Sequence, residues 1–236
     1  MKSIIKYILS LLVLAVAAMG AHYHTNTERP LAFVQKFKPT VGVEKDGKVN
    51  PIQKRGKPLY NGDTLRTSQD GFALVQFMDK SLAKVRPDSR LIVRGKVEDK
   101  NNTSTRIGLE LGEIFLNVSE QGGDNFEVAT NTSVASVKGT EFGASADDYF
   151  WVKEGEVEVR VKNTGNTVTL TNQTYAQVQE DGTVETGDLT DDEINRRDQK
   201  YKEMDEKMEP EIYKLRFIDE NGQEQVIEVK VFENDN

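Results

Sequence analysis

The stretch Val157–Lys162 reads Val-Glu-Val-Arg-Val-Lys. Because successive strand residues point to opposite faces of a sheet, this alternation places the valines on one face and the charged residues on the other. The turn-forming segment 163–166, Asn-Thr-Gly-Asn, follows, and Thr167–Leu170 then reads Thr-Val-Thr-Leu. Asn and Gly adopt the backbone conformations that tight hairpin turns require. The sequence therefore predicts two antiparallel strands joined by a short turn.

Turn signals recur on both sides of this hairpin. From Val41 onward, clusters of Asp, Asn and Gly separate short apolar runs at intervals of about 8–12 residues, which is typical of all-β domains. No helical periodicity of useful length precedes residue 188. We therefore predict an all-β fold over residues 38–186, either a sandwich or a short solenoid-like roll.

The pattern changes after residue 187. Thr190 and Glu193 have the spacing of a helix capping box, and acidic residues fill the first turn, as a helix N-terminus favours. Pro210 ends the predicted helix over 191–208. Alternating apolar residues on either side of Asn221-Gly222 then predict a terminal β-hairpin.

The N-terminus predicts export. Met1–Lys6 carries two lysines and no acidic residue, and Tyr7–Ala18 is apolar. Ala18 and Gly20 are the small residues expected before a signal-peptidase cut at Ala21. An uncleaved anchor formed by residues 4–21 is the alternative, and it would be the chain's contact with a membrane. In either case, the rest of the chain is expected in the periplasm or cell envelope.

The predicted domain organisation follows from these boundaries. It comprises a signal peptide or anchor (1–20), a polar linker (21–37), a β domain (38–187) and a C-terminal helix with a β-hairpin (188–236).

Composition limits the classes of function. The chain has 236 residues and a net charge of −8, so a general nucleic-acid role is not expected. Cysteine is absent, which excludes disulfides, thiol catalysis and cysteine metal sites.

Catalytic and metal-binding patterns are weak. The two histidines, His22 and His24, lie beside the predicted cleavage site and lack the fixed geometry that base catalysis needs. Two acidic residues could flank a glycosidic bond, as in a hydrolase, but turn formation or solvation explains each of the four candidates as well; these candidates are Asp63, Asp79, Glu141 and Glu154. The acidic cluster 188–193 does not have the spacing of an EF-hand. We therefore predict that the chain has no catalytic residue, metal or cofactor.

An aromatic cluster is a candidate contact surface. Tyr149, Phe150 and Trp151 are consecutive, so a strand would place aromatic rings on both faces. Core packing explains them, and an exposed contact of Tyr149 and Trp151 with a partner or glycan is the alternative.

Four motifs resemble the FecR-type domain, an all-β extracytoplasmic module of bacterial envelope proteins. They are Asn61–Thr67, Gly71–Asp79, Ser133–Phe142 and Val152–Val159. The resemblance extends over roughly 38–186. The motif residues to which we assign structural roles are Gly62, Asp63, Thr67, Gly71, Asp79, Gly139, Thr140, Phe142 and Gly155. In particular, Gly139 is expected where a Cβ would obstruct the backbone.

The resemblance implies a binding or scaffold role, not catalysis. FecR-type regulators of iron uptake carry a cytoplasmic sigma-binding segment before a transmembrane helix, whereas only Met1–Lys6 precedes the apolar run here. Asp79-Lys80-Ser81 also departs from the family's usual Asp-Gly-Ser turn. We therefore expect the exported module without anti-sigma activity, bound to an unidentified envelope protein. A carbohydrate- or peptidoglycan-binding module is the alternative, and a weak glycan-acting enzyme is a remoter one.

Overall fold

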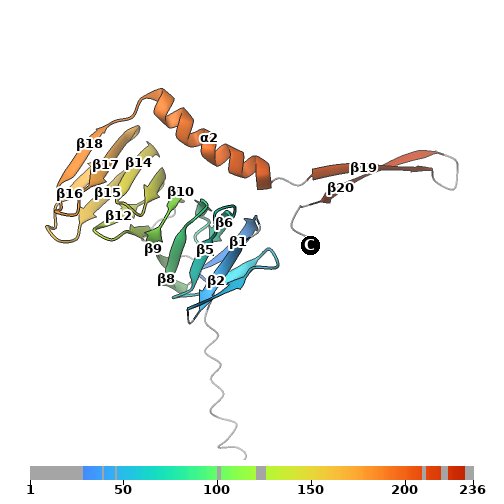
Figure 1. Cartoon of the computed structure of the whole chain (residues 1–236), viewed down its shortest axis with the longest axis horizontal. Coiled ribbons are helices and arrows are strands. Elements are labelled where there is room, and N and C mark those ends of the chain that lie inside the picture. The colour runs from blue at the N-terminus through green and yellow to red at the C-terminus, as the bar shows by residue number, and fades with distance from the viewer. Residues whose placement is uncertain are drawn as a thin grey trace, which may run out of the picture.

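In the computed structural model, two large and mostly antiparallel sheets, A and B, lie face to face (Figure 1). One long helix crosses the outer face of sheet A. The structure describes residues 29–38, 40–45, 47–99, 102–120, 126–208, 211–218 and 223–231. The predicted all-β sandwich with a C-terminal helix and hairpin is confirmed. The signal-peptide prediction lies outside the described residues.

Each sheet has nine strands. Sheet A contains, in spatial order, β18 (Val184–Asp188), β17 (Thr174–Val178), β14 (Tyr149–Glu154), β13 (Glu141–Ser145), β10 (Glu113–Asn117), β7 (Leu82–Val85), β6 (Ala73–Phe77), β1 (Ala32–Phe37) and β4 (Lys57–Leu59). Sheet B contains β16 (Thr167–Leu170), β15 (Val157–Val161), β12 (Ser133–Val137), β11 (Phe126–Ala129), β9 (Asn102–Leu111), β8 (Arg90–Asp99), β5 (Thr64–Thr67), β2 (Val41–Lys45) and β3 (Lys48–Pro51).

The chain passes repeatedly between the two sheets. After β6 and β7 in sheet A it forms β8 and β9 in sheet B, and the same alternation continues to β18. The turn spacing in the sequence is consistent with either a sandwich or a short solenoid-like roll. The structure is a sandwich of two sheets, and its chain alternates between the sheets as it would in a roll.

The core lies between the sheets and consists of alternate residues of each strand. Val157, Val159 and Val161 are fully buried, and β15 pairs with β16 in the register that places Val159 opposite Val168. The predicted hairpin is thus confirmed, with its valine face in the core.

The sandwich begins earlier than the predicted boundary at residue 38. Within the segment suggested to be a linker, β1 pairs with β4 on one side and β6 on the other. Ala32, Val34 and Phe37 are buried, and the ladder is irregular between Val34 and Lys36. That irregularity breaks the strict alternation that would have revealed the strand in the sequence.

Helix α2 (Asp191–Met208) begins with the predicted capping box. The hydroxyl of Thr190 lies 2.8 Å from a carboxylate oxygen of Glu193, which also accepts the Thr190 backbone N–H at 2.9 Å. Leu189, Ile194, Tyr201 and Met204 are buried against the outer face of sheet A. The helix is therefore part of the sandwich's packing.

Beyond the end of α2, strands β19 (Glu211–Ile218) and β20 (Glu224–Val231) form a two-stranded sheet of their own (Figure 1). Their register pairs Tyr213 with Val229 and Leu215 with Ile227. The predicted terminal hairpin is confirmed. Within the described ranges, no helix has the length and apolar character needed to cross a membrane.

Candidate interaction surfaces

The motif residues of the first half lie where the chain turns or crosses between the sheets. The carboxylate of Asp63 accepts the backbone N–H of Tyr60 at 2.9 Å, which closes the turn containing Gly62. The Thr67 hydroxyl donates to the backbone carbonyl of Arg86 at 2.6 Å and accepts the N–H of Ser89 at 2.9 Å. These bonds satisfy polar groups that burial would otherwise leave unpaired.

Gly71 and Asp79 also lie in connections. The Gly71 N–H donates to the Ser68 carbonyl in the turn before β6. Buried Asp79 accepts both the backbone N–H of Ser81, at 2.9 Å, and its hydroxyl, at 2.7 Å. The Ser81 hydroxyl oxygen in turn accepts the N–H of Ser119 at 3.1 Å. Asp79-Lys80-Ser81 therefore works as a turn, with Lys80 in the positive-φ position where the family has glycine.

The second group of motif residues meets at one junction. The Thr140 hydroxyl lies 3.0 Å from the Lys138 carbonyl and 2.8 Å from the Glu156 carbonyl, and so joins two segments. Gly139 has φ of 60° and Gly155 has φ of 99°. A Cβ on Gly155 would fall 2.8 Å from the Gly139 carbonyl oxygen. The segments around Gly139 and Gly155 therefore pack closely against each other, and the absence of a side chain on Gly155 permits this contact.

Phe142 follows this junction and is completely buried in the core between the sheets. It pairs with Leu116 of β10 and Val152 of β14. The motif residues therefore lie at the turns and crossings of the sandwich and in its core, and they do not gather at one common site.

Tyr149 and Trp151 lie on the outer face of sheet A. One row across this face contains Tyr175, Trp151, Gly143 and Phe115 as successive register partners. The indole of Trp151 lies over Gly143, where a Cβ would overlap it, and stacks on Phe115 with ring centroids 5.5 Å apart. Tyr149 stacks on Tyr175 at the same centroid distance.

Helix α2 covers this aromatic face. Trp151 is 1% exposed, and its indole N–H has no hydrogen-bond partner among the described residues. Tyr201 packs on Phe115 with centroids 4.9 Å apart. The guanidinium of Arg197 lies 4.8 Å from the Tyr149 ring centroid and 5.4 Å from that of Trp151, within cation–π range.

Polar contacts hold the helix to the sheet. The Tyr201 hydroxyl donates to a Glu113 carboxylate oxygen at 3.0 Å, and Arg86 pairs with the other oxygen at 3.2 Å. Burial raises the pKa of Tyr201 well above its usual value, and the adjacent Glu113 carboxylate raises it further. Arg197 also donates to the Tyr149 hydroxyl at 2.9 Å.

Lys153 forms a second polar connection. Its ammonium lies 3.0 Å from Asp198 of the helix and 3.3 Å from Glu141 of β13. Burial acts to lower the pKa of Lys153, but the bond to Asp198 and the charge of Glu141 outweigh it and raise the pKa. A hollow of about 290 Å³ opens beside these residues, between α2 and sheet A.

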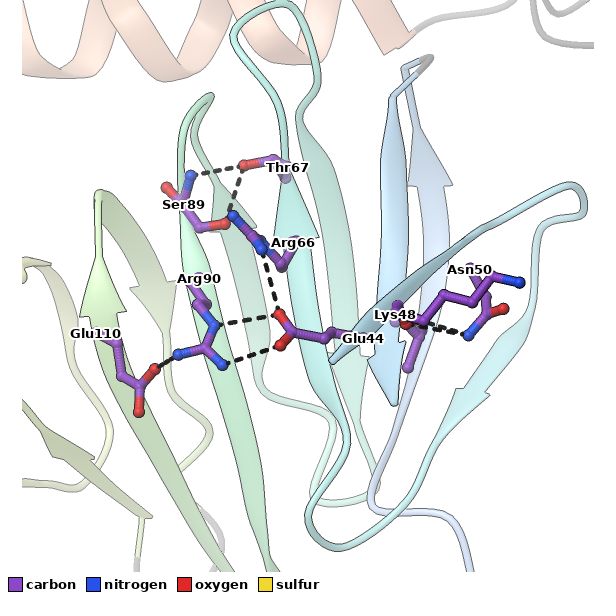
Figure 2. Close-up of polar contacts among 9 residues, drawn as sticks. Glu44, Lys48, Asn50, Arg66, Thr67, Ser89, Arg90 and Glu110 are labelled. Atoms are coloured by element: carbon purple, nitrogen blue, oxygen red, sulfur yellow. Dashed lines mark hydrogen bonds and ion pairs between the residues drawn. The ribbon is translucent and has the colours of Figure 1, made fainter. Parts of the chain in front are cut away.

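The outer face of sheet B is charged instead. Figure 2 shows the Glu44 carboxylate between Arg66 and Arg90, with Arg90 also bound to Glu110. The hydrogen bond from Arg90 lowers the pKa of Glu44, and the positive charges of Arg90 and Arg66 act in the same direction. A hollow of about 380 Å³ beside Glu44 is lined by Tyr60–Thr64, which includes the motif residues Gly62 and Asp63.

The acidic residues considered for catalysis are separated or already bonded. Glu141 and Glu154 are register partners on β13 and β14, but Glu141 is bound to Asn117 at 2.8 Å and to Lys153. Asp63 and Asp79 support separate turns. In the described part of the chain, no group of three or more potential metal-ligating His, Asp or Glu residues occurs. His22 and His24 lie outside it.

The sequence reasoning missed Arg197 and Glu113. Arg197 is one turn from Tyr201 and so shares its helix face, a spacing that could have indicated it. Glu113 carries no local signal, because it is 88 residues from its partner Tyr201.

Comparison with known proteins gives a family match in the middle of the chain. The family model described as "FecR protein" matches residues 63–161. No curated protein matches the chain.

Two crystal structures of a candidate anti-sigma factor from Parabacteroides distasonis are similar to this one. The first shares 18% identity at a TM-score of 0.49, over 58% of this chain and 64% of that chain. The second shares 17% identity at a TM-score of 0.48, over 56% of this chain and 62% of that chain. The matches thus span less than two thirds of that protein. Residues 63–161, the part of the chain that matches the FecR family model, contain every motif residue of the FecR resemblance except Gly62.

Proposed function

We propose that this protein is an exported, non-catalytic binding module of the bacterial cell envelope that takes part in envelope signalling through a protein partner. The observation that carries the proposal is the match of residues 63–161 to the FecR family model, because FecR-type domains belong to envelope-associated signalling proteins. The predicted signal segment, residues 1–20, supports export.

The terminal hairpin is the element that we assign to the partner. Its two strands pair only with each other among the described strands. A hairpin of two strands is only marginally stable in water, so a third strand or a covering layer would stabilise it. Addition of a partner strand to an exposed edge is a common mode of protein recognition.

Crosslinking in intact cells tests this assignment. A photo-crosslinking residue placed at Lys230 in β20 should capture a specific envelope protein, and one placed at Arg160 on sheet B should not. A chain that ends at residue 208 retains α2 but lacks the hairpin, and it should lose co-purification of the same protein. Equal capture from both positions would contradict the role of the hairpin.

A glycan-binding role is the second candidate, because of the aromatic face containing Tyr149 and Trp151. Aromatic rings with an unpartnered indole N–H form a surface that a sugar could contact if α2 moved aside. Cosedimentation with purified cell-wall fragments separates the two functions. Sedimentation that Trp151→Phe weakens would favour the glycan, and protein that remains in the supernatant would favour the protein partner.

The export prediction has its own measurement. N-terminal sequencing of the protein from the envelope fraction should give Ala21 as the first residue. A chain that still begins at Met1 and requires detergent for extraction would show that residues 4–21 form an anchor.

A further inference from the structure

We propose that the protein associates with a second copy of itself through strand β16, which pairs with its symmetry mate across a two-fold axis. β16 lies at one edge of sheet B, and β3 lies at the other (Figure 1). This association is separate from the partner contact assigned to the terminal hairpin.

The backbone of β16 presents an open edge. Val161 N–H donates to the Asn166 carbonyl, and Lys162 N–H donates to the Thr132 carbonyl on the other side of β15. Because hydrogen-bonded and non-hydrogen-bonded pairs alternate along an antiparallel ladder, Val168 and Leu170 direct their backbone groups toward β15. Thr167 and Thr169 therefore direct theirs away from the sheet.

The sequence around β16 lacks the features that normally protect an edge. No charged residue occurs from Asn163 to Gln179, in a chain in which 30% of residues are charged. Edge strands are usually blunted by lysine, proline or inward charges. The other edges of the two sheets have such residues: Lys48 and Pro51 in β3, Lys57 and Pro58 in β4, and Glu185 and Asp188 in β18.

Strand β16 is complementary to itself in one register. If the outward backbone groups of two copies bond, Thr167 of one pairs with Thr169 of the other, and Val168 lies opposite Val168. Thr–Thr and β-branched cross-strand pairs are favourable. Thr167 and Thr169 are exposed on the outer face, whereas Val168 is partly buried against the core. The pairing thus places hydroxyls opposite hydroxyls and a valine opposite a valine.

The interface would be small. Stable specific interfaces bury about 1,200–2,000 Å² in total, and a four-residue strand contributes only part of that area. The dimer should therefore be reversible and depend on protein concentration. An isologous contact of this kind closes on itself, so association should stop at the dimer.

Charged substitutions at positions 167 and 169 of the same chain test the proposed register between the two copies of β16. In Thr167→Lys/Thr169→Lys, each lysine lies opposite a lysine of the other copy; in Thr167→Lys/Thr169→Glu, each lysine lies opposite a glutamate. We expect sedimentation equilibrium of the full chain to show a monomer–dimer equilibrium for the parent. The Lys/Lys variant should raise the dimer dissociation constant roughly tenfold, and the Lys/Glu variant should restore dimerisation.

Control variants show whether dimerisation depends on the β16 edge or on another surface. Val49→Lys places a charge on the opposite edge of sheet B, at a residue that is 40% exposed, and should leave the dimer unchanged. Circular dichroism should show that all variants remain folded, because the substituted threonines are exposed. A parent that is monomeric at every concentration overturns the proposal, and so does equal dimerisation of the Lys/Lys and Lys/Glu variants.

Discussion

The outer faces of the two sheets have opposite chemistry although both belong to one sandwich. Sheet A carries the row Tyr175, Trp151 and Phe115, interrupted by Gly143, and α2 packs on it. Sheet B carries the network of Glu44, Arg66, Arg90 and Glu110 and has no covering element among the described residues.

This difference shows that the inward residues specify the sandwich and the outward residues determine what covers it. Both sheets use the same alternation and share one core. The outward residues of sheet A are aromatic, and α2 packs on them, which removes their rings from water and stabilises the fold. The outward residues of sheet B are charged, and charged side chains in ion pairs remain exposed to water with little loss of stability.

Removal of α2 should give the largest effect on this comparison. A chain ending at residue 188 exposes Trp151, Phe115 and Phe72 and leaves Glu113 without Tyr201. We expect it to lose cooperative thermal unfolding by circular dichroism, or to aggregate. A chain ending at residue 208 keeps α2 and should melt like the parent. If the shorter chain melts as the parent does, α2 is not part of the cooperative unit.

Substitution of single residues on the two faces should give the next largest effect. Trp151→Ala should lower the free energy of unfolding by about 3–5 kcal/mol, because it removes a buried aromatic side chain and leaves a cavity beneath α2. Arg106→Ala on sheet B removes an exposed ion-pair partner of Glu127 and should change the free energy of unfolding by less than about 0.5 kcal/mol. Urea unfolding monitored by circular dichroism measures both. Similar losses for the two variants would refute the distinction between the faces.

The sequence predicted the elements better than their mutual positions. The Val157–Leu170 hairpin and the helix cap at Thr190 were predictable because turn chemistry, alternation and capping are local. The long hairpin of β8 and β9 was missed, since its distal part, around residues 96–105, is polar and resembles a loop. β1 was missed because its alternation is irregular.

The aromatic face shows a further limit of sequence reasoning. Consecutive aromatic residues indicated that β14 would place rings on both faces, and the capping box of Thr190 and Glu193 indicated that a helix follows. Nothing local connected these two observations. The connection depends on the register of Phe115 and Trp151 across β13, which only the folded sheet defines.

Tyr201→Phe tests the polar connection beneath α2 and should have a smaller effect. It keeps the ring but removes the hydrogen bond to Glu113, so we expect a loss of about 1–2 kcal/mol near neutral pH. Because burial raises the pKa of Tyr201 above its usual value of 10.0, ionisation favours the unfolded chain as the pH rises above 10. The stability advantage of the parent should therefore shrink above pH 10. An advantage that is constant with pH would mean that Tyr201 is not held neutral by burial.

Glu44→Gln on sheet B should give the smallest effect, and its pH dependence should have the opposite sign. Arg90 and Arg66 lower the pKa of Glu44 below its usual value of 4.5 in the folded chain. A lowered folded-state pKa stabilises the protein above the unfolded value and loses that contribution as the pH falls.

The unfolding midpoints of the parent and Glu44→Gln should therefore differ near neutral pH and converge as the pH falls below 4.5. Added salt should also reduce the difference near neutral pH, because the network lies on the exposed face and is screened (Figure 2). Trp151→Ala, whose effect arises from packing, should keep its deficit in the same salt series. If salt leaves the Glu44→Gln difference unchanged, the ion pairs do not account for the contribution of Glu44, and sheet B would depend on packing as sheet A does.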